Sequence, residues 1–397
     1  MVLLSLLLIV HAFLWIFVAE WKLRRHRALT PRLLPAEHAP ASESGIAVFV
    51  PARNEERAIR AAITSLLRQR GLGRYAVICA NDHSTDGTGR ILRRLKRGVM
   101  ADRFAHFDVP ELPQGWMGKC HGLYHAVKRA PKDAEFYLFT DADVIHAPDT
   151  VRRAHAHMVR ENADLLAIVP RVDCVGFWEN AVMPVLMHIG SLTINPANLN
   201  DPTRKDIAGI GAFCMLRRSM YEKWGGHRAI RGEVIDDMAM AFMTKRARGK
   251  MLLVRDPRAI HLRMYTDLAS IISGFEKNMH TAIGGGFART AAAATGFVIG
   301  HLLPLMVSVA ALMIGGKGSG ALALAGLGVA FLYGLLLVFR IRTVMKLTPW
   351  MVVVGYPLGV LLCGWIMVRS AWQGAVLGEV RWRGRVIKRP KQKVKLA

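Results

Sequence analysis

Apolar residues are distributed very unevenly along this chain, and that distribution constrains the fold more than any other feature. One uncharged apolar run covers residues 2–18, and three more cover residues 294–314, 321–339 and 350–368. Each is about long enough to cross the hydrocarbon core of a bilayer as a helix, which takes roughly 17 to 25 residues. Residues 45–286 have an ordinary globular composition. We therefore expect a folded central domain with transmembrane helices at both ends of the chain.

The charges that flank the first run indicate its orientation. A cleaved signal peptide would carry positive charge before the run, whereas here the basic residues follow it. They are Lys22, Arg24, Arg25, Arg27 and Arg32. Because loops rich in Lys and Arg stay in the cytoplasm, we expect the N-terminus outside and the central domain in the cytoplasm, at the cell (inner) membrane.

The three C-terminal runs raise a problem of parity. A Gly-rich connection at residues 315–320 and a basic one at residues 340–346 predict a hairpin whose tight turn lies outside. Four full spans would then place the tail outside as well. Residues 381–397, however, carry eight basic and no acidic side chains, which predicts a cytosolic tail. Either one run is re-entrant or interfacial, or the chain has a further span.

The net charge of +25 predicts a polyanionic partner. Much of this charge borders the apolar runs, and we find no recognisable nucleic-acid-binding module. We therefore expect anionic membrane lipids, and no nucleic acid, as partners. The five cysteines are scattered and show no C-x-x-C spacing, which excludes a disulfide framework and a recognisable zinc site.

The central segment alternates between short apolar strands and amphipathic stretches. We expect strands at residues 46–50, 76–81, 136–140 and 165–170, with helices such as 56–68 and 121–129 between them. This order predicts an α/β domain with a mixed, mainly parallel sheet. Ligands of such sheets bind at the carboxyl ends of the strands, where the polar clusters of this chain also fall.

Two carboxylates follow the predicted strand at residues 136–140. Asp141 and Asp143 are one residue apart at a strand end, where they can share a divalent cation. Carboxylate oxygens suit Mg²⁺ or Mn²⁺, and such a cation neutralises a diphosphate. The sequence therefore predicts a metal site at Asp143 and Asp141.

Another polar cluster, residues 81–88 (NDHSTDGT), directly follows the strand at 76–81. These residue types favour turns and helix caps by themselves. The functional interpretation is that Asp82 accepts hydrogen bonds from a nucleoside. Residues 51–55 (PARNE) end the first predicted strand in the same manner.

Further motifs lie downstream, and with the clusters above they point to one family. Residues 112–119 read LPQGWMGK, residues 225–231 read GGHRAIR, and Asp236 and Asp237 form an acidic pair. Together they resemble the inverting family-2 glycosyltransferases of the GT-A fold, in particular membrane-bound members that act on carotenoids, hopanoids and sphingolipids. The resembling motifs are P-x-R-N-E, D-D-x-S-x-D-G-T, L-P-x-G-W-x-G-K, D-x-D, G-G-H-x-x-x-R and E-D.

The resemblance implies roles for individual residues. Asp237 is implied as the catalytic base, with Asp236 replacing the Glu of the E-D pair. An inverting transfer needs such a carboxylate to take a proton from the acceptor hydroxyl. The implied donor-binding residues are Pro51, Arg53, Glu55, Asp82, Lys119, Asp141, Lys277 and Asn278.

Two motifs depart from the family pattern. Asn81 replaces the first Asp of D-D-x-S-x-D-G-T, and residues 276–280 (EKNMH) replace the usual Q-x-x-R-W. The second departure disfavours a polymer product, although Lys277 and Asn278 retain groups that hold a diphosphate. Residues 381–385 (RWRGR) resemble a W-K-G-R tail element, and a polybasic membrane anchor explains them equally well.

The resemblance implies an enzyme that transfers a sugar from a nucleotide-diphosphate sugar to a lipid-like acceptor of isoprenoid, hopanoid or sphingolipid type. The alternatives are a polyprenyl-phosphate sugar transferase, a polysaccharide synthase, or a membrane protein of this fold that binds nucleotide or lipid without turnover.

We expect an N-terminal helix and basic linker at residues 1–40 and a catalytic domain with interfacial helices at 41–290. Transmembrane helices are expected at 291–370 and a basic tail at 371–397.

Overall fold

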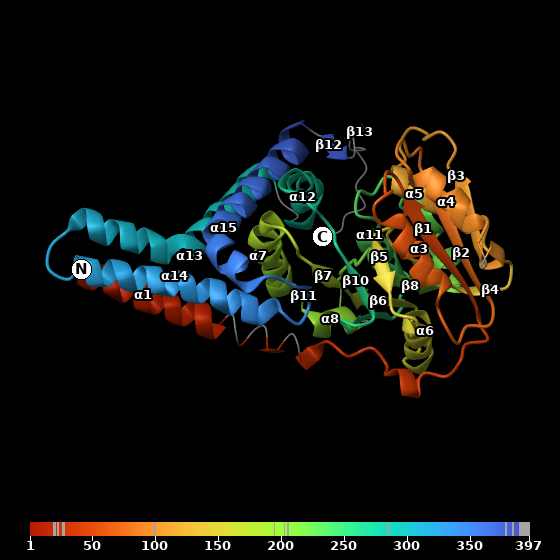
Figure 1. Cartoon of the computed structure of the whole chain (residues 1–397), viewed down its shortest axis with the longest axis horizontal. Coiled ribbons are helices and arrows are strands. Elements are labelled where there is room, and N and C mark those ends of the chain that lie inside the picture. The colour runs from red at the N-terminus through yellow and green to blue at the C-terminus, as the bar shows by residue number, and fades with distance from the viewer. Residues whose placement is uncertain are drawn as a thin grey trace.

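The computed structural model describes residues 1–388 apart from 19–20, 22–23, 26–27, 99–100, 194, 202, 205, 284–285, 378 and 383–384. It also does not describe the side chains of residues 18, 101, 192–193, 277–278, 280–283 and 375–388. A rounded unit of strands and helices between residues 45 and 283, here called the α/β domain, lies at one end of the molecule. Long helices project from it, and the N-terminus lies at their far tip (Figure 1).

Seven strands form the main sheet, in the order β3-β2-β1-β4-β8-β6-β9. β1 pairs in parallel with β2 and β4, and β6 pairs in parallel with β9, whereas β8 is antiparallel to β4 and β6. The mixed, mainly parallel sheet and the four predicted strands are therefore confirmed. The strands are β1 Gly45–Ala52, β2 Tyr75–Asn81, β3 Phe104–Asp108, β4 Ala134–Phe139, β6 Leu165–Val169, β8 Cys214–Arg217 and β9 Met251–Arg255.

Helices cover both faces of this sheet. Successive residues of β1 point to opposite faces, so that Val48 packs with α3, α4 and α6 in one core and Phe49 packs with α5, α9 and α11 in the other. Both predicted helices are present, but α3 begins later than expected because the N–H groups of Glu55 and Glu56 bond to side chains of the 84–88 loop. The helices are α3 Ile59–Leu67, α4 Thr88–Lys96, α5 Gly118–Val127, α6 Thr150–Arg160, α8 Pro196–Asn200, α9 Arg218–Lys223, α10 Gly226–Ala229 and α11 Asp236–Arg246.

A smaller sheet, which the sequence did not predict, joins the α/β domain to the C-terminal helices. Its order is β11-β7-β10-β5. β11 lies between two long apolar helices in the chain, yet it pairs with β7, with Met345 opposite Val172. The strands are β5 Val144–His146, β7 Arg171–Asp173, β10 Ile260–Leu262 and β11 Met345–Lys346.

Three helices of the described part of the chain are long and apolar enough to cross a membrane. They are α13 Phe287–Ile314, α14 Ser319–Ile341 and α15 Pro349–Ala371. The N-terminal apolar helix, Val2–Phe17, is shorter, and its last part (Leu14–Val18) is a π-helix after α1 (Val2–Phe13). The predicted tight turn between α13 and α14 is present: Gly315, Gly316 and Gly318 all have positive φ, which other residues avoid.

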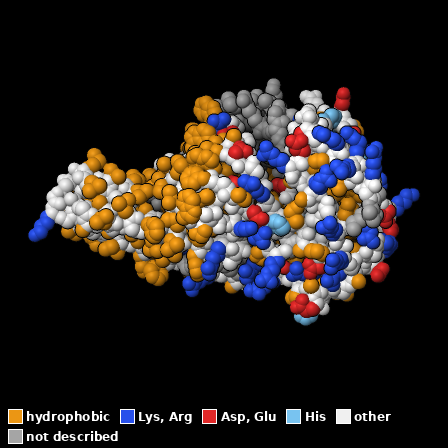
Figure 2. Space-filling model, viewed as in Figure 1, with side chains coloured by type: hydrophobic (Ala, Val, Ile, Leu, Met, Phe, Trp, Pro, Cys, Tyr) orange, Lys and Arg blue, Asp and Glu red, His pale blue; other side chains and the backbone are white. Residues whose placement is uncertain are grey.

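Two further helices of this domain, α7 Phe177–Thr193 and α12 Leu268–Ile283, pack against α15 (Figure 1). In space filling, hydrophobic side chains cover the projecting helices, and Lys and Arg side chains gather over the α/β domain (Figure 2). After α15 come the π-helix Trp372–Leu377 and a hairpin of β12 Glu379–Trp382 and β13 Arg385–Lys388.

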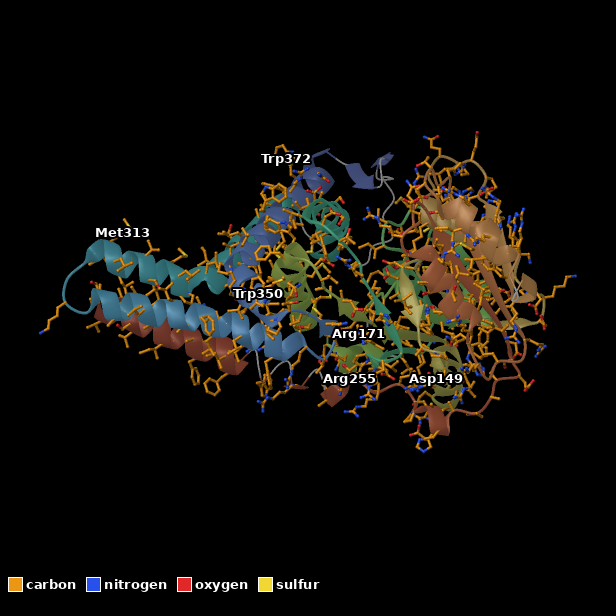
Figure 3. The ribbon with its side chains drawn as sticks, in the orientation of Figure 1. Asp149, Arg171, Arg255, Met313, Trp350 and Trp372 are labelled. Carbon is orange, nitrogen blue, oxygen red and sulfur yellow. The ribbon has the colours of Figure 1, made fainter. Side chains whose placement is uncertain are left out.

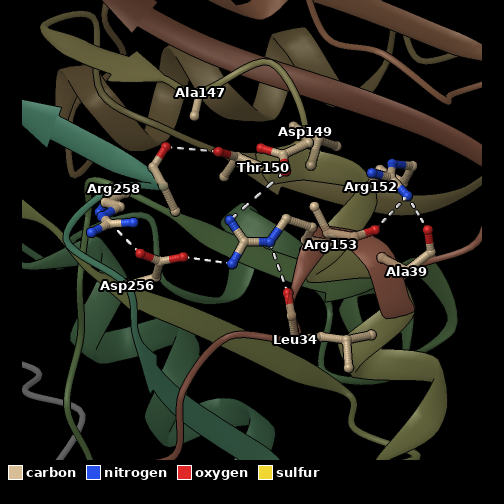
Figure 4. Close-up of polar contacts among 12 residues, drawn as sticks. Leu34, Ala39, Ala147, Asp149, Thr150, Arg152, Arg153, Asp256 and Arg258 are labelled. Atoms are coloured by element: carbon tan, nitrogen blue, oxygen red, sulfur yellow. Dashed lines mark hydrogen bonds and ion pairs between the residues drawn. The ribbon is translucent and has the colours of Figure 1, made fainter.

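The basic linker after α1 is fixed to the α/β domain by two arginines of α6 (Figure 4). Arg153 donates to the Leu34 carbonyl at 2.7 Å and pairs with Asp256 at 2.5 Å. Arg152 donates to the Ala39 carbonyl. Residues 34–39 of the linker therefore lie against α6 of the α/β domain.

Candidate active site

The loops that follow β1 and β2 are joined by hydrogen bonds. Arg53 Nη1 donates to the Asp82 carbonyl at 3.0 Å and lies 3.7 Å from the Asp82 carboxylate. The side chain of Asn54, which has a φ of 54°, accepts from the Thr85 N–H at 2.8 Å. Asp82 is buried and lies at the carboxyl end of β2. Hydrogen bonds thus join the two predicted donor-binding clusters.

Asn81, the departure from the family pattern, has a structural partner. Its Nδ2 donates to Asp108 Oδ1 at 2.6 Å, at the end of β3. An aspartate at position 81 would place a second carboxylate against Asp108, and close like charges repel. The amide therefore suits this position better than the Asp of the motif.

A lysine and three aspartates from three separate segments meet at the centre of the sheet edge. Lys119 Nζ, from the first turn of α5, lies 2.8 Å from Asp141 Oδ1 and 3.0 Å from Asp236 Oδ1. Asp141 follows β4, and Asp236 and Asp237 begin α11. Lys119 and Asp141 are about a third exposed, whereas Asp236 is buried. The cluster is thus open to a ligand on one side.

The charges of this cluster change the pKa values of its members. Burial alone lowers the pKa of Lys119, but Asp141, Asp236 and Asp237 outweigh burial and raise that pKa well above its usual value. Burial and the neighbouring Asp236 raise the pKa of Asp237 to about 6, against the opposite effects of Lys119 and of the Met238 N–H. Lys119 therefore stays charged, and Asp237 titrates close to neutral pH.

Two glycines that belong to none of the predicted motifs, Gly209 and Gly211, pack closely against the cluster. A Cβ at position 211 would lie 2.8 Å from Asp141 Oδ2, 3.4 Å from Asp237 Oδ2 and 3.5 Å from Lys119 Nζ. Gly209 lies against the backbone of Asp237 and Met238, which leaves no room for a Cβ. Isolated glycines before a strand indicate a close backbone approach, and this signal was present in the sequence at Gly209 and Gly211.

The donor set of the D-x-D segment fits a magnesium-type ion. Asp141 and Asp143 are partly exposed on either side of the buried Ala142. Among the described residues, no group of three or more His, Cys, Asp or Glu side chains could hold a metal. Mg²⁺ commonly takes one or two protein carboxylates and completes its shell with water and substrate phosphates, so two carboxylates suffice.

The remaining predicted residues lie at different places. Pro51 belongs to β1 itself, and the N–H of Glu55 donates to Thr88 Oγ1 at 2.8 Å. Lys277 and Asn278 fall on α12, and their side chains lie outside the described ones. His227 is buried, its pKa is lowered by burial to about 4, and its Nδ1 lies 2.9 Å from the Tyr221 hydroxyl, all of which indicate a structural histidine.

Gly211→Ala is expected to lower catalytic turnover at this cluster roughly 10²-fold, because the added methyl group displaces Asp141, and misplacing a reacting group by about 1 Å has an effect of that size. The atom it meets is the free end of a side chain, so the fold is retained. Gly122→Ala in α5 is the matched control, since its Cβ meets neighbours at an ordinary 3.5 Å. The measurement is turnover together with the melting temperature; equal activity of the two variants would contradict the placement of Gly211.

Residues 47–225 match the family model described as Glycosyl transferase family 2. A 4,4'-diaponeurosporenoate glycosyltransferase of Staphylococcus aureus (strain USA300) is 23% identical over 266 residues, which are 66% of this chain and 66% of that protein, just under two thirds of its length. The protein of that name from the bovine strain RF122 / ET3-1 is 22% identical over 366 residues, or 91% and 92% of the two chains.

Solved structures with a similar arrangement include the mannosyltransferase PcManGT from Pyrobaculum calidifontis in complex with GDP-Man and Mn²⁺. It is 16% identical, with a TM-score of 0.47 over 94% of this chain and 96% of that chain. TarS of S. aureus is also 16% identical, with a TM-score of 0.38 over 58% and 38%.

The match to the family model covers β1 to α9, and therefore includes Asp82, Lys119, Asp141 and Asp143. The apolar helices lie on either side of the matched segment. The domain at residues 47–225 belongs to Glycosyl transferase family 2, with the mixed α/β fold of a glycosyltransferase and membrane-type helices attached to it.

Proposed function

We propose that this protein is a membrane glycosyltransferase that moves a sugar, with inversion, from a nucleotide-diphosphate sugar to a lipid-like acceptor. The observation that carries the proposal is the cluster in which Lys119 lies within 3.0 Å of Asp141 and Asp236, with Asp237 beside them. The Lys119 ammonium group can bind the negatively charged diphosphate, and the Asp237 carboxylate, whose pKa is raised, can accept a proton. These are the two functions that the reaction needs.

The residues divide the reaction between them. Asp82 and Arg53 receive the nucleoside, with Pro51 and Glu55 shaping their loop, and Lys119 faces the diphosphate. Asp237 takes the proton of the acceptor hydroxyl while its oxygen bonds to the anomeric carbon, and the bond from that carbon to the nucleoside diphosphate breaks on the opposite face. Asp236 holds Lys119 in place at 3.0 Å.

A divalent cation fits this scheme. Asp143 and Asp141 would hold Mg²⁺ or Mn²⁺. When bound, the ion would stabilise the negative charge of the leaving diphosphate. Lys277 and Asn278, whose helix α12 follows β10, are proposed as further contacts of the diphosphate.

The acceptor is proposed to come from the membrane. The name of the S. aureus relatives denotes a carotenoid-type carboxylate, and the apolar helices support an association with the membrane, where such molecules dissolve. Isoprenoid, hopanoid and sphingolipid-type acceptors share this location. We further propose that residues 41–290 act as the catalytic domain and face the cytoplasm, as the basic linker indicates.

The test is transfer of radiolabelled sugar by the purified full-length protein in vesicles of bacterial lipid extract. We expect a labelled, acid-stable lipid, and mass spectrometry of lipids from cells with and without the gene identifies it. An acid-labile phospholipid product would indicate a polyprenyl-phosphate sugar transferase, and a water-soluble polymer would indicate a polysaccharide synthase. Binding of nucleotide sugar without any transfer or hydrolysis would contradict enzymatic function.

A further inference from the structure

The first end of α15 is attached to the α/β domain. β11, which ends three residues before α15, pairs with β7 of that domain, and the Cys174 N–H donates to the Lys346 carbonyl at 2.8 Å. The Thr348 N–H, directly before α15, donates to Asn180 Oδ1 of α7 at 2.7 Å. The chain therefore returns to the domain between α14 and α15.

The last turn of α15 is attached to the domain as well. Arg369 forms an ion pair with Glu276 of α12. Gln373, just after α15, donates to the same carboxylate at 3.1 Å. Trp372 packs against Phe287, the first residue of α13, with ring centroids 5.8 Å apart. α12 precedes the first C-terminal crossing, so the end of α15 lies on the side of the membrane that the domain occupies.

α15 contacts α13 and α14 in the halves of those helices that lie nearest the α/β domain, as the two attachments require. Gly364 lies against Val298, in the first half of α13, and a Cβ at Gly334, in the second half of α14, would lie 3.0 Å from Val353 Cα. The far halves of α13 and α14 pack instead against α1, through Leu8, Val307, Ala311, Leu322 and Ala323. Figure 1 shows α15 running steeply across the direction that α1 and α14 share.

One face of α15 is exposed and apolar as far as Trp365; Arg369, whose side chain is about half exposed, follows on the same face, and Trp372 comes directly after the helix. Its members recur at helical spacing, three, four or seven residues apart, and they are Trp350, Val354, Leu358, Leu361, Trp365 and Trp372. We call this face the tryptophan stripe. Trp350 and Trp372 lie near the two ends of α15, while Met313 lies at the far tip of the projecting helices (Figure 3).

We propose that α15 does not cross the membrane but lies in its interface, on the side of the α/β domain, with the tryptophan stripe among the lipids. Its 23 residues measure about 34 Å, so length alone allows a crossing, but both ends are held on one side. Tryptophan is the residue type that favours the membrane interface. Exposed apolar side chains also lie on α13 and α14, for example Met306, Val309 and Leu335.

This arrangement leaves two crossings after the α/β domain, by α13 and α14. The chain then ends on the side of the α/β domain, with its basic tail beside the basic linker. The parity problem posed by the charge distribution disappears without a further span. The side on which the tail lies relative to the domain does not depend on the proposed reaction.

The first test uses single cysteines and an impermeant maleimide on intact cells and on inverted vesicles. The five native cysteines are buried and stay in place. Lys317→Cys lies in the turn between α13 and α14, Arg97→Cys is exposed on the α/β domain, and Lys391→Cys lies in the tail. We expect Lys391→Cys to react from the same side as Arg97→Cys, opposite to Lys317→Cys. Reaction from the side of Lys317→Cys would show that α15 crosses and would overturn the proposal.

The second test measures depth by attaching spin labels to cysteines along the stripe, in vesicles of the full-length protein. Labels at Val354, Leu358, Leu361 and Trp365 are expected to have the same shallow depth. Labels at Met306, Val309 and Met313, exposed on α13, provide the graded reference of a crossing helix. A maximum of depth at the middle of α15 would overturn the proposal, whatever the enzyme transfers.

Discussion

Asp143→Ala is expected to abolish sugar transfer while the protein still folds and inserts into the membrane. A metal ion stabilises a leaving diphosphate by several kcal/mol, so removal of its carboxylate ligand corresponds to a loss of about 10³-fold or more. Asp143 is partly exposed, and its removal leaves the core strand β4 intact. The measurement is turnover of the variant at saturating Mg²⁺ or Mn²⁺. Turnover of the wild type is also measured in excess EDTA, where the same loss is expected.

Asp133→Ala is the matched control for this variant. Asp133 precedes the same strand at its opposite end and makes an exposed ion pair with Arg74 at 3.2 Å. Exposed pairs of this kind contribute little to stability, so this variant should behave as the wild type. Undiminished activity of Asp143→Ala, or full wild-type activity in EDTA, would remove the metal from the proposal.

The second large effect is expected for Asp237→Asn, which should lose about 10²- to 10⁴-fold in turnover because an amide cannot accept the acceptor's proton. Nucleotide binding should persist, since Lys119 contacts Asp141 and Asp236 rather than Asp237 within hydrogen-bonding distance. The measurement is paired: product formation, and nucleotide affinity by calorimetry, on one preparation. Asp206→Asn, an exposed aspartate before the Gly209 loop, is the control.

The pH profile gives the same prediction an independent readout. Burial and Asp236 raise the pKa of Asp237 to about 6, and only the ionised carboxylate can take a proton. Wild-type turnover should therefore fall about tenfold per pH unit below pH 6 and level off above it, whereas the residual activity of Asp237→Asn should lack this acid limb.

Near-normal turnover of Asp237→Asn would contradict the base role and leave Asp236 as the next candidate. It would also agree with a carboxylate acceptor, which is already ionised at neutral pH and needs no base. Loss of nucleotide binding would instead place the acidic pair on the donor.

The sequence by itself determined the class of fold and suggested residues for the candidate site. Alternating apolar strands such as β1 bury Val48 and Phe49 on opposite faces, and this pattern is local in the chain. The polar residues after the strands could be placed at one sheet edge because parallel strands end together. This reasoning placed Asp82 and Asp141 at strand ends, whereas Lys119 and Asp236 begin helices.

Only the tertiary structure decided how these residues act on one another. Asp236 and Asp237 lie far from Lys119 in the chain, and the raised pKa of Asp237 comes from burial and neighbours that a sequence does not place. Gly211 matters because the side chains of Asp141 and Asp237 lie so close to it that a Cβ would meet them, and not because of the conformational preference of glycine. Asn81 likewise departs from a motif for a reason that lies on β3.

The same division holds for the membrane helices. Hydropathy identified the apolar runs, because the free energy of transfer into lipid depends on composition and length. It could not decide whether α15 spans the membrane or lies in its interface, since an apolar helix of this length is compatible with both. The pairing of β11 with β7, and of Arg369 with Glu276, joins residues distant in sequence, and these long-range contacts fix both ends of α15 beside the domain.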